Sequence, residues 1–195
     1  IKVPPVRWLV LMQCAYFCAG FSNTINVTFT SLITELQPLD GLGAKMWLLV
    51  GIAAPPAPLI WDRLARRIGR LNALSWAYVL NIMGNICLAM TNSVETTAIA
   101  AILFGITFMG IVSLTLSTIG HLYGFKATQV MARLTFFYCI AQILSPILAG
   151  TVAELSGSFT MPLFVVSIIM LLGLIFLLTA RRYSPDQTAS GSIRL

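Results

Sequence analysis

The sequence contains few charged residues and almost no histidine. Of its 195 residues, 9% are charged, six are acidic and one, His121, is a histidine. Soluble domains carry about 25% charged residues, and the apolar share here is 58%. This balance excludes an ordinary water-soluble domain and favours an integral membrane protein.

Catalytic and metal-binding groups are scarce as well. No acidic residue lies well inside an apolar run, and His121 lies near the end of one. An intramembrane enzyme needs a nucleophile with a base, or paired carboxylates or metal ligands, so we expect no enzyme and no cofactor. The four cysteines lie within apolar runs as small buried hydrophobes. Because Cys14 and Cys18 have no histidine or carboxylate nearby, no metal site is expected.

Long apolar runs are what the sequence has instead. Six of them have about the 20 residues that cross roughly 30 Å of hydrocarbon. The sequence therefore predicts an all-α integral membrane fold with six transmembrane helices in one domain, residues 1–182. The expected helices are residues 8–31, 42–61, 71–90, 98–120, 132–153 and 160–180, and a disordered cytoplasmic tail is expected at 183–195.

The basic residues lie in alternate gaps between these runs. Ten of the twelve follow this pattern, and Lys45 is the exception, in a gap of the other set; the ten are Lys2, Arg7, Arg63, Arg66, Arg67, Arg70, Lys126, Arg133, Arg181 and Arg182. The excess of basic residues in cytoplasmic loops predicts that both termini are cytoplasmic. This topology explains the net charge of +6 without a nucleic-acid partner. Burying four arginines at the bilayer centre costs about 10 to 14 kcal/mol, so residues 63–70 are expected to form a loop.

Polar residues inside the runs gather on helix faces. In the first run they share one stripe at about 100° per residue, and the fourth and fifth runs carry shorter stripes. Two interpretations remain open, because such groups either line a solute path or hydrogen-bond between packed helices. Asn81 and Asn85, in the third run, are interpreted as structural. The candidate solute contacts are Tyr16, Asn23, Asn26, Thr30, Ser113, Tyr138 and Gln142.

Three prolines, Pro55, Pro56 and Pro58, crowd the end of the second run. Proline removes an amide donor and clashes with the preceding turn. We therefore expect a bend or an unwound end just before the arginine cluster.

The segment WDRLARRIGR, residues 61–70, resembles the loop motif G-x-x-x-D-R-x-G-R-R of the major facilitator superfamily. When Gly69 and Arg70 are aligned with the second glycine and the following base, Asp62 takes the place of the first glycine. Arg66 then stands where the motif has its acid. WLLVG at 47–51, GITFMG at 105–110, QIL at 142–144 with Pro146 and Gly150, and GSF at 157–159 extend the resemblance. They resemble the YbfB/YjiJ branch of bacterial transporters, over about residues 20–175.

This resemblance implies the C-terminal six-helix half of a transporter, built as two inverted three-helix repeats. It also implies transport of a small solute by alternating access, with a conformational latch at the loop. The implied latch residues are Asp62, Arg63, Arg67, Gly69 and Arg70. The expected partners are membrane lipids, the solute, and the N-terminal six-helix half, or a second copy if the chain is complete. The alternative is a six-helix membrane scaffold that transports nothing and binds another membrane protein.

Overall fold

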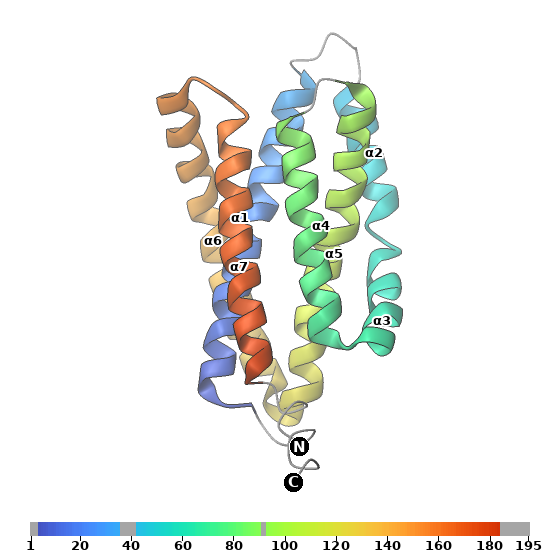
Figure 1. The fold of residues 1–195 in the computed structure, drawn as a ribbon, viewed down its shortest axis with the longest axis vertical. Helices are drawn as coiled ribbons and strands as arrows, with labels where there is room; N and C mark the ends of the chain where they lie inside the picture. The colour runs from blue at the N-terminus through green and yellow to red at the C-terminus, as the bar shows by residue number, and fades with distance from the viewer. Residues whose placement is uncertain (1–3, 36–41, 91–92, 184–195) are drawn as a thin grey trace.

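The computed structural model describes residues 4–35, 42–90 and 93–183, and every regular element in them is helical. Figure 1 shows the helices as one upright bundle. The helices are α1 (Val6–Glu35), α2 (Leu42–Ala53), α3 (Ala57–Ile68), α4 (Arg70–Ala89), α5 (Val94–Tyr123), α6 (Ala127–Ser156) and α7 (Met161–Arg182). A single 3-10 turn, Gly124–Lys126, joins α5 to α6. Apart from Tyr183, the tail predicted at 183–195 lies outside the described residues.

Several helices are long and apolar enough to cross a bilayer. Arg70–Ala89, Met161–Arg182 and the run Val94–Ser156, which contains both α5 and α6, qualify by length and composition. The bent pair Gly43–Ala53 and Ala57–Ile68 qualifies as one broken span. The described part of the chain is therefore an all-α membrane bundle, while the arrangement of six spans in repeats stays a prediction.

The bend expected at the prolines is present. α2 and α3 meet at 44° across the break that contains Pro55 and Pro56. Two consecutive prolines remove two amide donors, so the helical hydrogen bonds cannot continue through this point. The span expected at 42–61 is consequently two helices, and α3 runs on past it to Ile68.

α1 packs between α6 and α7. α7 packs against both α1 and α4, α6 packs against α1, α4 packs against α5, and the bent pair lies along α5. The main core consists of fully buried side chains from several helices, among them Trp8, Tyr78, Leu134 and Leu177. The Tyr78 hydroxyl donates to the Ala15 carbonyl at 2.8 Å, which ties α4 to α1.

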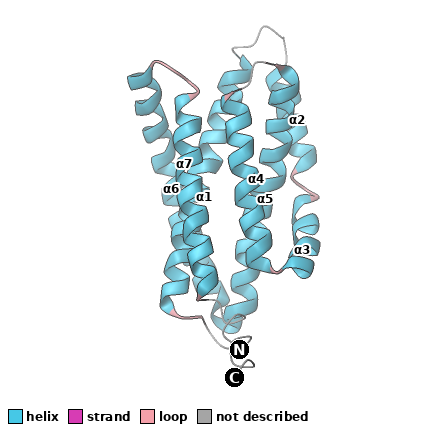
Figure 2. Ribbon diagram, viewed as in Figure 1, coloured by secondary structure: helices cyan, strands magenta, loops and turns pink. Residues whose placement is uncertain are grey.

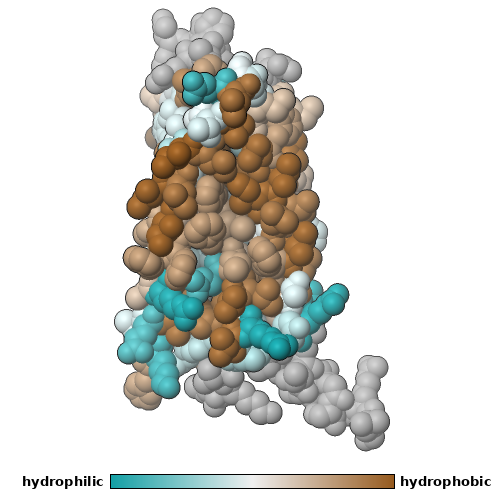
Figure 3. Space-filling model, turned by 90° about the vertical axis from the view of Figure 1, so that its left-hand side faces the viewer, coloured by the Kyte–Doolittle hydropathy of each residue, from teal (hydrophilic) through white to brown (hydrophobic). Residues whose placement is uncertain are grey.

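The outer face of the bundle is apolar around its middle. Large side chains such as Phe136, Ile143 and Ile147 on α6 and Leu171 on α7 are exposed. Figure 3 shows apolar residues covering the middle of this face, with polar residues gathered toward the ends. A water-soluble monomer rarely exposes apolar area on this scale, so this face fits hydrocarbon or another membrane helix.

One end of the bundle collects the basic residues. α1 begins and α7 ends there, and the α3–α4 and α5–α6 junctions lie at the same end (Figures 1 and 2). Arg7, Arg66, Lys126 and Arg182 belong to these four places. We call it the basic end.

Candidate functional site

A small pocket lies inside the bundle, between α1, α4, α5, α6 and α7. Its lining residues are Ala19, Asn23, Asn81, Phe104, Phe108, Ile111, Tyr138 and Met170. The volume of this pocket that the centre of a water molecule can reach is about 10 Å³. That is room for about one water molecule. The pocket is too small for a solute larger than water, so a larger solute needs the helices to separate.

Asn23 provides the pocket's unsatisfied polar atom. Its Oδ1 is buried and accepts no hydrogen bond from the described residues. Buried polar atoms almost always have a partner, so an orphan in a pocket calls for an explanation. Asn23 is one of the seven residues that the sequence predicts as solute contacts, and it is the one whose acceptor is left for another molecule.

Aromatic rings form much of the remaining wall. Tyr138, which is 7% exposed, stacks on Tyr16 with ring centroids 4.5 Å apart. Phe104 and Phe108 stack at 5.8 Å on the α5 side. The Tyr pair requires close contact between α1 and α6, which Gly20 allows because a Cβ there would lie 2.7 Å from the Tyr138 carbonyl oxygen. Two predicted contacts, Tyr16 and Tyr138, are therefore brought together, and of the two Tyr138 lines the pocket with Asn23.

A buried polar network lies next to the pocket and joins α1, α4 and α5. The Ser22 hydroxyl donates to Asn81 Oδ1 at 2.7 Å, and the Asn26 amide donates to Asn85 Oδ1 at 2.6 Å. The Asn81 amide donates in turn to the Thr107 hydroxyl at 3.0 Å. All five side chains are buried. Such bonds between membrane helices stabilise packing by about 0.6 kcal/mol each on average. Because the Asn26 amide donates to Asn85, it is engaged in a contact between α1 and α4.

The other predicted contacts lie apart from the pocket lining. Thr30 is buried on α1 four residues beyond Asn26, toward the end opposite the basic end. The Ser113 hydroxyl donates to the Gly110 carbonyl of its own helix at 3.2 Å. Gln142 is half-buried on α6, one turn beyond Tyr138. These three residues stay predicted contacts.

Sequence reasoning did not select several residues of the pocket and the network. Phe104, Phe108 and Met170 line the pocket, and Ser22 and Thr107 complete the network. One signal was available for the network. Ser22 with Asn26, and Asn81 with Asn85, are polar pairs four residues apart, which places each pair on one helix face. Two such faces in neighbouring apolar runs indicate helices that hydrogen-bond to each other.

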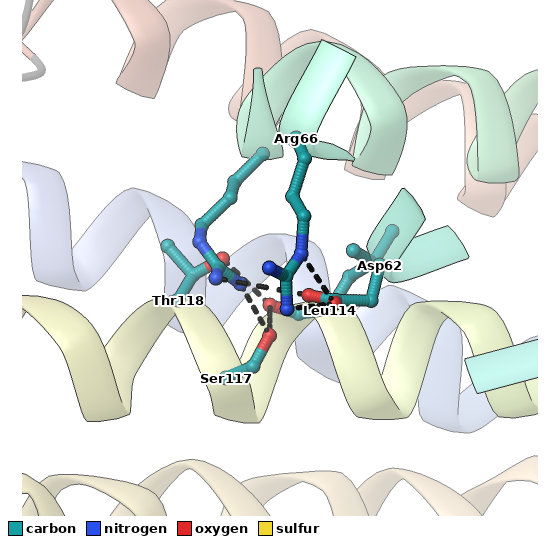
Figure 4. A network of polar contacts seen from close by, with 6 residues as sticks. Asp62, Arg66, Leu114, Ser117 and Thr118 are labelled. Carbon is teal, nitrogen blue, oxygen red and sulfur yellow. Dashed lines mark hydrogen bonds and ion pairs between the residues drawn. The ribbon is translucent and has the colours of Figure 1, made fainter. Parts of the chain in front are cut away.

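The predicted latch segment forms a second site at the basic end. Asp62 Oδ2 lies 2.8 Å from an Arg66 nitrogen, and Asp62 Oδ1 lies 3.8 Å from an Arg70 nitrogen. Arg70 also donates to the Ser117 hydroxyl of α5 at 2.9 Å. Figure 4 shows Asp62 and Arg66 of α3 facing Ser117 and Thr118 of α5. The acid therefore connects α3 to the start of α4, and Arg70 connects both to α5.

The expectation that residues 63–70 form a loop is wrong. α3 continues to Ile68, so Arg63, Arg66 and Arg67 are helical, and only Gly69 interrupts the chain before α4 begins. Keeping arginine out of hydrocarbon requires water around its head group, and a helix that extends beyond the membrane meets that requirement as well as a loop does. Arg63 and Arg67 are exposed on this helix.

Gly69 makes the sharp turn between α3 and α4. Its φ of +92° lies in a region that residues with a Cβ rarely adopt. Its amide still donates to the Ala65 carbonyl at 2.9 Å, which closes the last turn of α3. The turn brings Arg70 back alongside Asp62.

Solved transporters share this fold. The crystal structure of an auto-inhibited POT family peptide transporter aligns with a TM-score of 0.76 and 17% identity, over 91% of this chain and 38% of that one. A POT peptide transporter mutant, E310Q, in complex with sulfate aligns with a TM-score of 0.73 and 16% identity, over 97% of this chain and 43% of that one. The chain thus spans about two fifths of the length of these transporters. Its class is that of a membrane protein with part of a major facilitator fold.

Residues 4–178 match the family described as "Uncharacterised MFS-type transporter YbfB". The chain belongs to this family of major facilitator transporters, as the sequence resemblance predicted. No curated protein sequence matches it. The family and the structural relatives are transporters rather than enzymes.

Proposed function

We propose that this chain is one half of a secondary active transporter that moves a small solute across the membrane by alternating access. Its family supports transport. Its alignment with 38% and 43% of two complete transporters supports half of a fold. The proposed partner is an N-terminal six-helix half, or a second copy of this chain if the chain is complete, and membrane lipids cover the remaining apolar face.

The proposed half contains six spans in two inverted triplets. The first triplet is α1, the bent pair and α4, and the second is α5, α6 and α7. The family resemblance implies that the first helix of each triplet lines the path, and α1 and α5 both contribute to the pocket. The basic end is cytoplasmic in this proposal, because basic residues are retained on that side of a bacterial inner membrane.

The contacts at the basic end support a latch. Asp62, Arg66, Arg70 and Ser117 connect the α3–α4 turn to α5 through partly exposed charges. Exposed ion pairs contribute little stability and can exchange partners at low cost. Arg63 and Arg67 leave exposed guanidinium groups for a facing half to contact.

The observation that carries the proposal is the unpartnered Oδ1 of Asn23 in the pocket between α1, α5 and α6. Solute contact by Asn23 and Tyr138, which line the pocket, is proposed from it, and contact by Tyr16 is proposed because its ring stacks on Tyr138. Asn26, Thr30, Ser113 and Gln142 are proposed contacts only in conformations where the helices have separated.

The test uses the intact transporter in liposomes loaded with an extract of the producing cells. Solutes that exchange across the membrane are identified by mass spectrometry, with empty liposomes as the control. Replacement of Asn23 by leucine is expected to reduce exchange without reducing the amount of folded protein. If no solute exchanges, and the protein purifies with a stoichiometric membrane partner, the scaffold alternative replaces the proposal.

A further inference from the structure

The pocket wall carries no charge on any lining residue that the structure describes. Its polar members are Asn23, Asn81 and Tyr138. The amide of Asn81 is already used, because its Oδ1 accepts from Ser22 and its Nδ2 donates to Thr107. Asn23 Oδ1 has no partner among the described residues, so it is an acceptor that this wall offers to a solute.

This acceptor selects against charged partners. An anion cannot donate a hydrogen bond to a carbonyl oxygen. A cation can donate one, but burying a charge without a countercharge costs far more than one hydrogen bond returns. An uncharged N–H or O–H group satisfies the oxygen without either cost.

The rest of the wall is suited to an apolar ring. Phe104 and Phe108 are stacked with an interplanar angle of 17° on one side, and Tyr138 is held against Tyr16 on the other. Met170 also lines the pocket. Aromatic rings pack well in offset or edge contacts with such surfaces.

We propose that the solute is uncharged and joins a hydrogen-bond donor, held by Asn23 Oδ1, to an apolar ring-sized body that lies against Phe104, Phe108 and Tyr138. The inference rests on the proposed transport function and names the solute class of that site. The pocket widens to admit this body when α1 and α5 separate, since in the closed form it has room for about one water molecule.

Four compounds of similar shape test the class on the intact transporter. They are phenylacetamide, its N,N-dimethyl derivative, phenylacetate and phenethylammonium. Binding is measured from the concentration dependence of thermal stabilisation. Phenylacetamide is expected to bind about tenfold tighter than the dimethyl derivative, which has lost the donor. The anion and the cation are expected to bind more weakly than phenylacetamide.

Two substitutions assign the preference to Asn23. Asn23→Leu keeps a similar volume without the acceptor, so the two amides should bind equally. Asn23→Asp keeps the acceptor and adds a negative charge, so phenethylammonium should become the preferred compound. Thr151→Ala is the control, because that hydroxyl is exposed and bonds to the carbonyls of its own helix. It should keep the wild-type order.

Three results overturn the solute class: tightest binding by phenylacetate, phenethylammonium or the dimethylamide, an unchanged order in Asn23→Leu, or no stabilisation by any compound, which leaves the pocket to water. Exchange in liposomes separates this failure from failure of the transport proposal. If phenylacetamide binds in the expected order but no solute crosses the membrane, transport is wrong and the class of ligand stands. If charged solutes exchange and are unaffected by Asn23→Leu, transport stands and the class is wrong.

Discussion

Trp61 of α3 lies directly on the backbone of α5 at Gly110. The indole is 3% exposed, and its Nε1 donates to the Ile106 carbonyl at 3.0 Å. Gly110 makes this approach possible, because a Cβ there would lie 2.9 Å from Trp61 Cε2 and closer still to Nε1 and Cδ1. The Trp61 ring therefore occupies the space that a side chain at residue 110 would fill.

Gly110→Ala should displace the indole. Overpacking a close contact costs about 1 to 3 kcal/mol, and loss of the hydrogen bond to Ile106 adds about 0.5 to 1.5 kcal/mol. We expect the free energy of unfolding to fall by about 1.5 to 4.5 kcal/mol, the sum of these terms. The change acts on the contact between α3 and α5, so the latch residues on α3 should also shift.

The assay is unfolding of the intact transporter by SDS in mixed micelles. Gly150→Ala provides a matched control, because Gly150 lies within α6 and a Cβ there meets no atom within 4 Å. Alanine is the better helix former by about 1 kcal/mol, so this control should be neutral or slightly stabilising.

A double-mutant cycle isolates the steric term. Trp61→Ala alone should cost about 3 to 5 kcal/mol as a buried aromatic truncation. Once the indole is gone, the added methyl of Gly110→Ala no longer overlaps its three nearest atoms, which all belong to Trp61. The double variant should therefore be no less stable than Trp61→Ala alone. The reasoning is refuted if Gly110→Ala behaves like Gly150→Ala, or if the two costs add.

Three further substitutions test the other helix contacts. Asn26→Ala leaves Asn85 Oδ1 without its 2.6 Å donor and should lower the free energy of unfolding by about 1 to 2 kcal/mol in the same SDS assay; unchanged stability would return Asn26 to the solute path. Arg70→Gln should change stability by less than about 1 kcal/mol because its ion pair is partly exposed, yet alter the rate of solute exchange in liposomes, and equal exchange rates would argue against a latch. Gly20→Val should cost about 1 to 3 kcal/mol, since a Cβ there meets the Tyr138 carbonyl oxygen at 2.7 Å; wild-type stability would show that α1 and α6 can separate freely.

Apolar run length and proline chemistry predicted most of the fold. The helix expected at 71–90 is α4 at Arg70–Ala89, and the expected bend at Pro55 and Pro56 is present. The extent of α3 was not predicted, because charge cost specifies only that arginine heads reach water. It does not distinguish a loop from a helix that leaves the membrane, and Arg66 and Arg67 are helical.

The candidate site was predictable in part. A polar stripe on one helix identified Asn23 and Asn26 together, but it could not tell which neighbour each of them faces. Their directions differ by about 60° at 100° per residue. That rotation is enough to point Asn26 at α4, where Asn85 receives its amide, while Asn23 is left at the pocket. The rotation of α1 about its axis is set by packing against α6 and α7, which a stripe does not encode.

α5 connects the pocket, the network and the latch. Three contacts lie close together along α5. Gly105 allows α2 to pack closely at the Val50 carbonyl, and Gly110 allows the Trp61 ring of α3 to do the same. Between them, the Thr107 hydroxyl accepts a hydrogen bond from Asn81 of α4. Phe104 and Phe108 face the pocket from the same stretch. These contacts lie on different sides of one helix. Rotation or sliding of α5 would therefore disturb the close helix contacts at Gly105 and Gly110, a buried hydrogen bond and the pocket wall together. The bent pair, α4 and α5 should therefore move as one body. The pocket then opens at the contacts between this body and α1 or α6, and opening it against α1 also breaks the hydrogen bonds of Ser22 and Asn26 to α4.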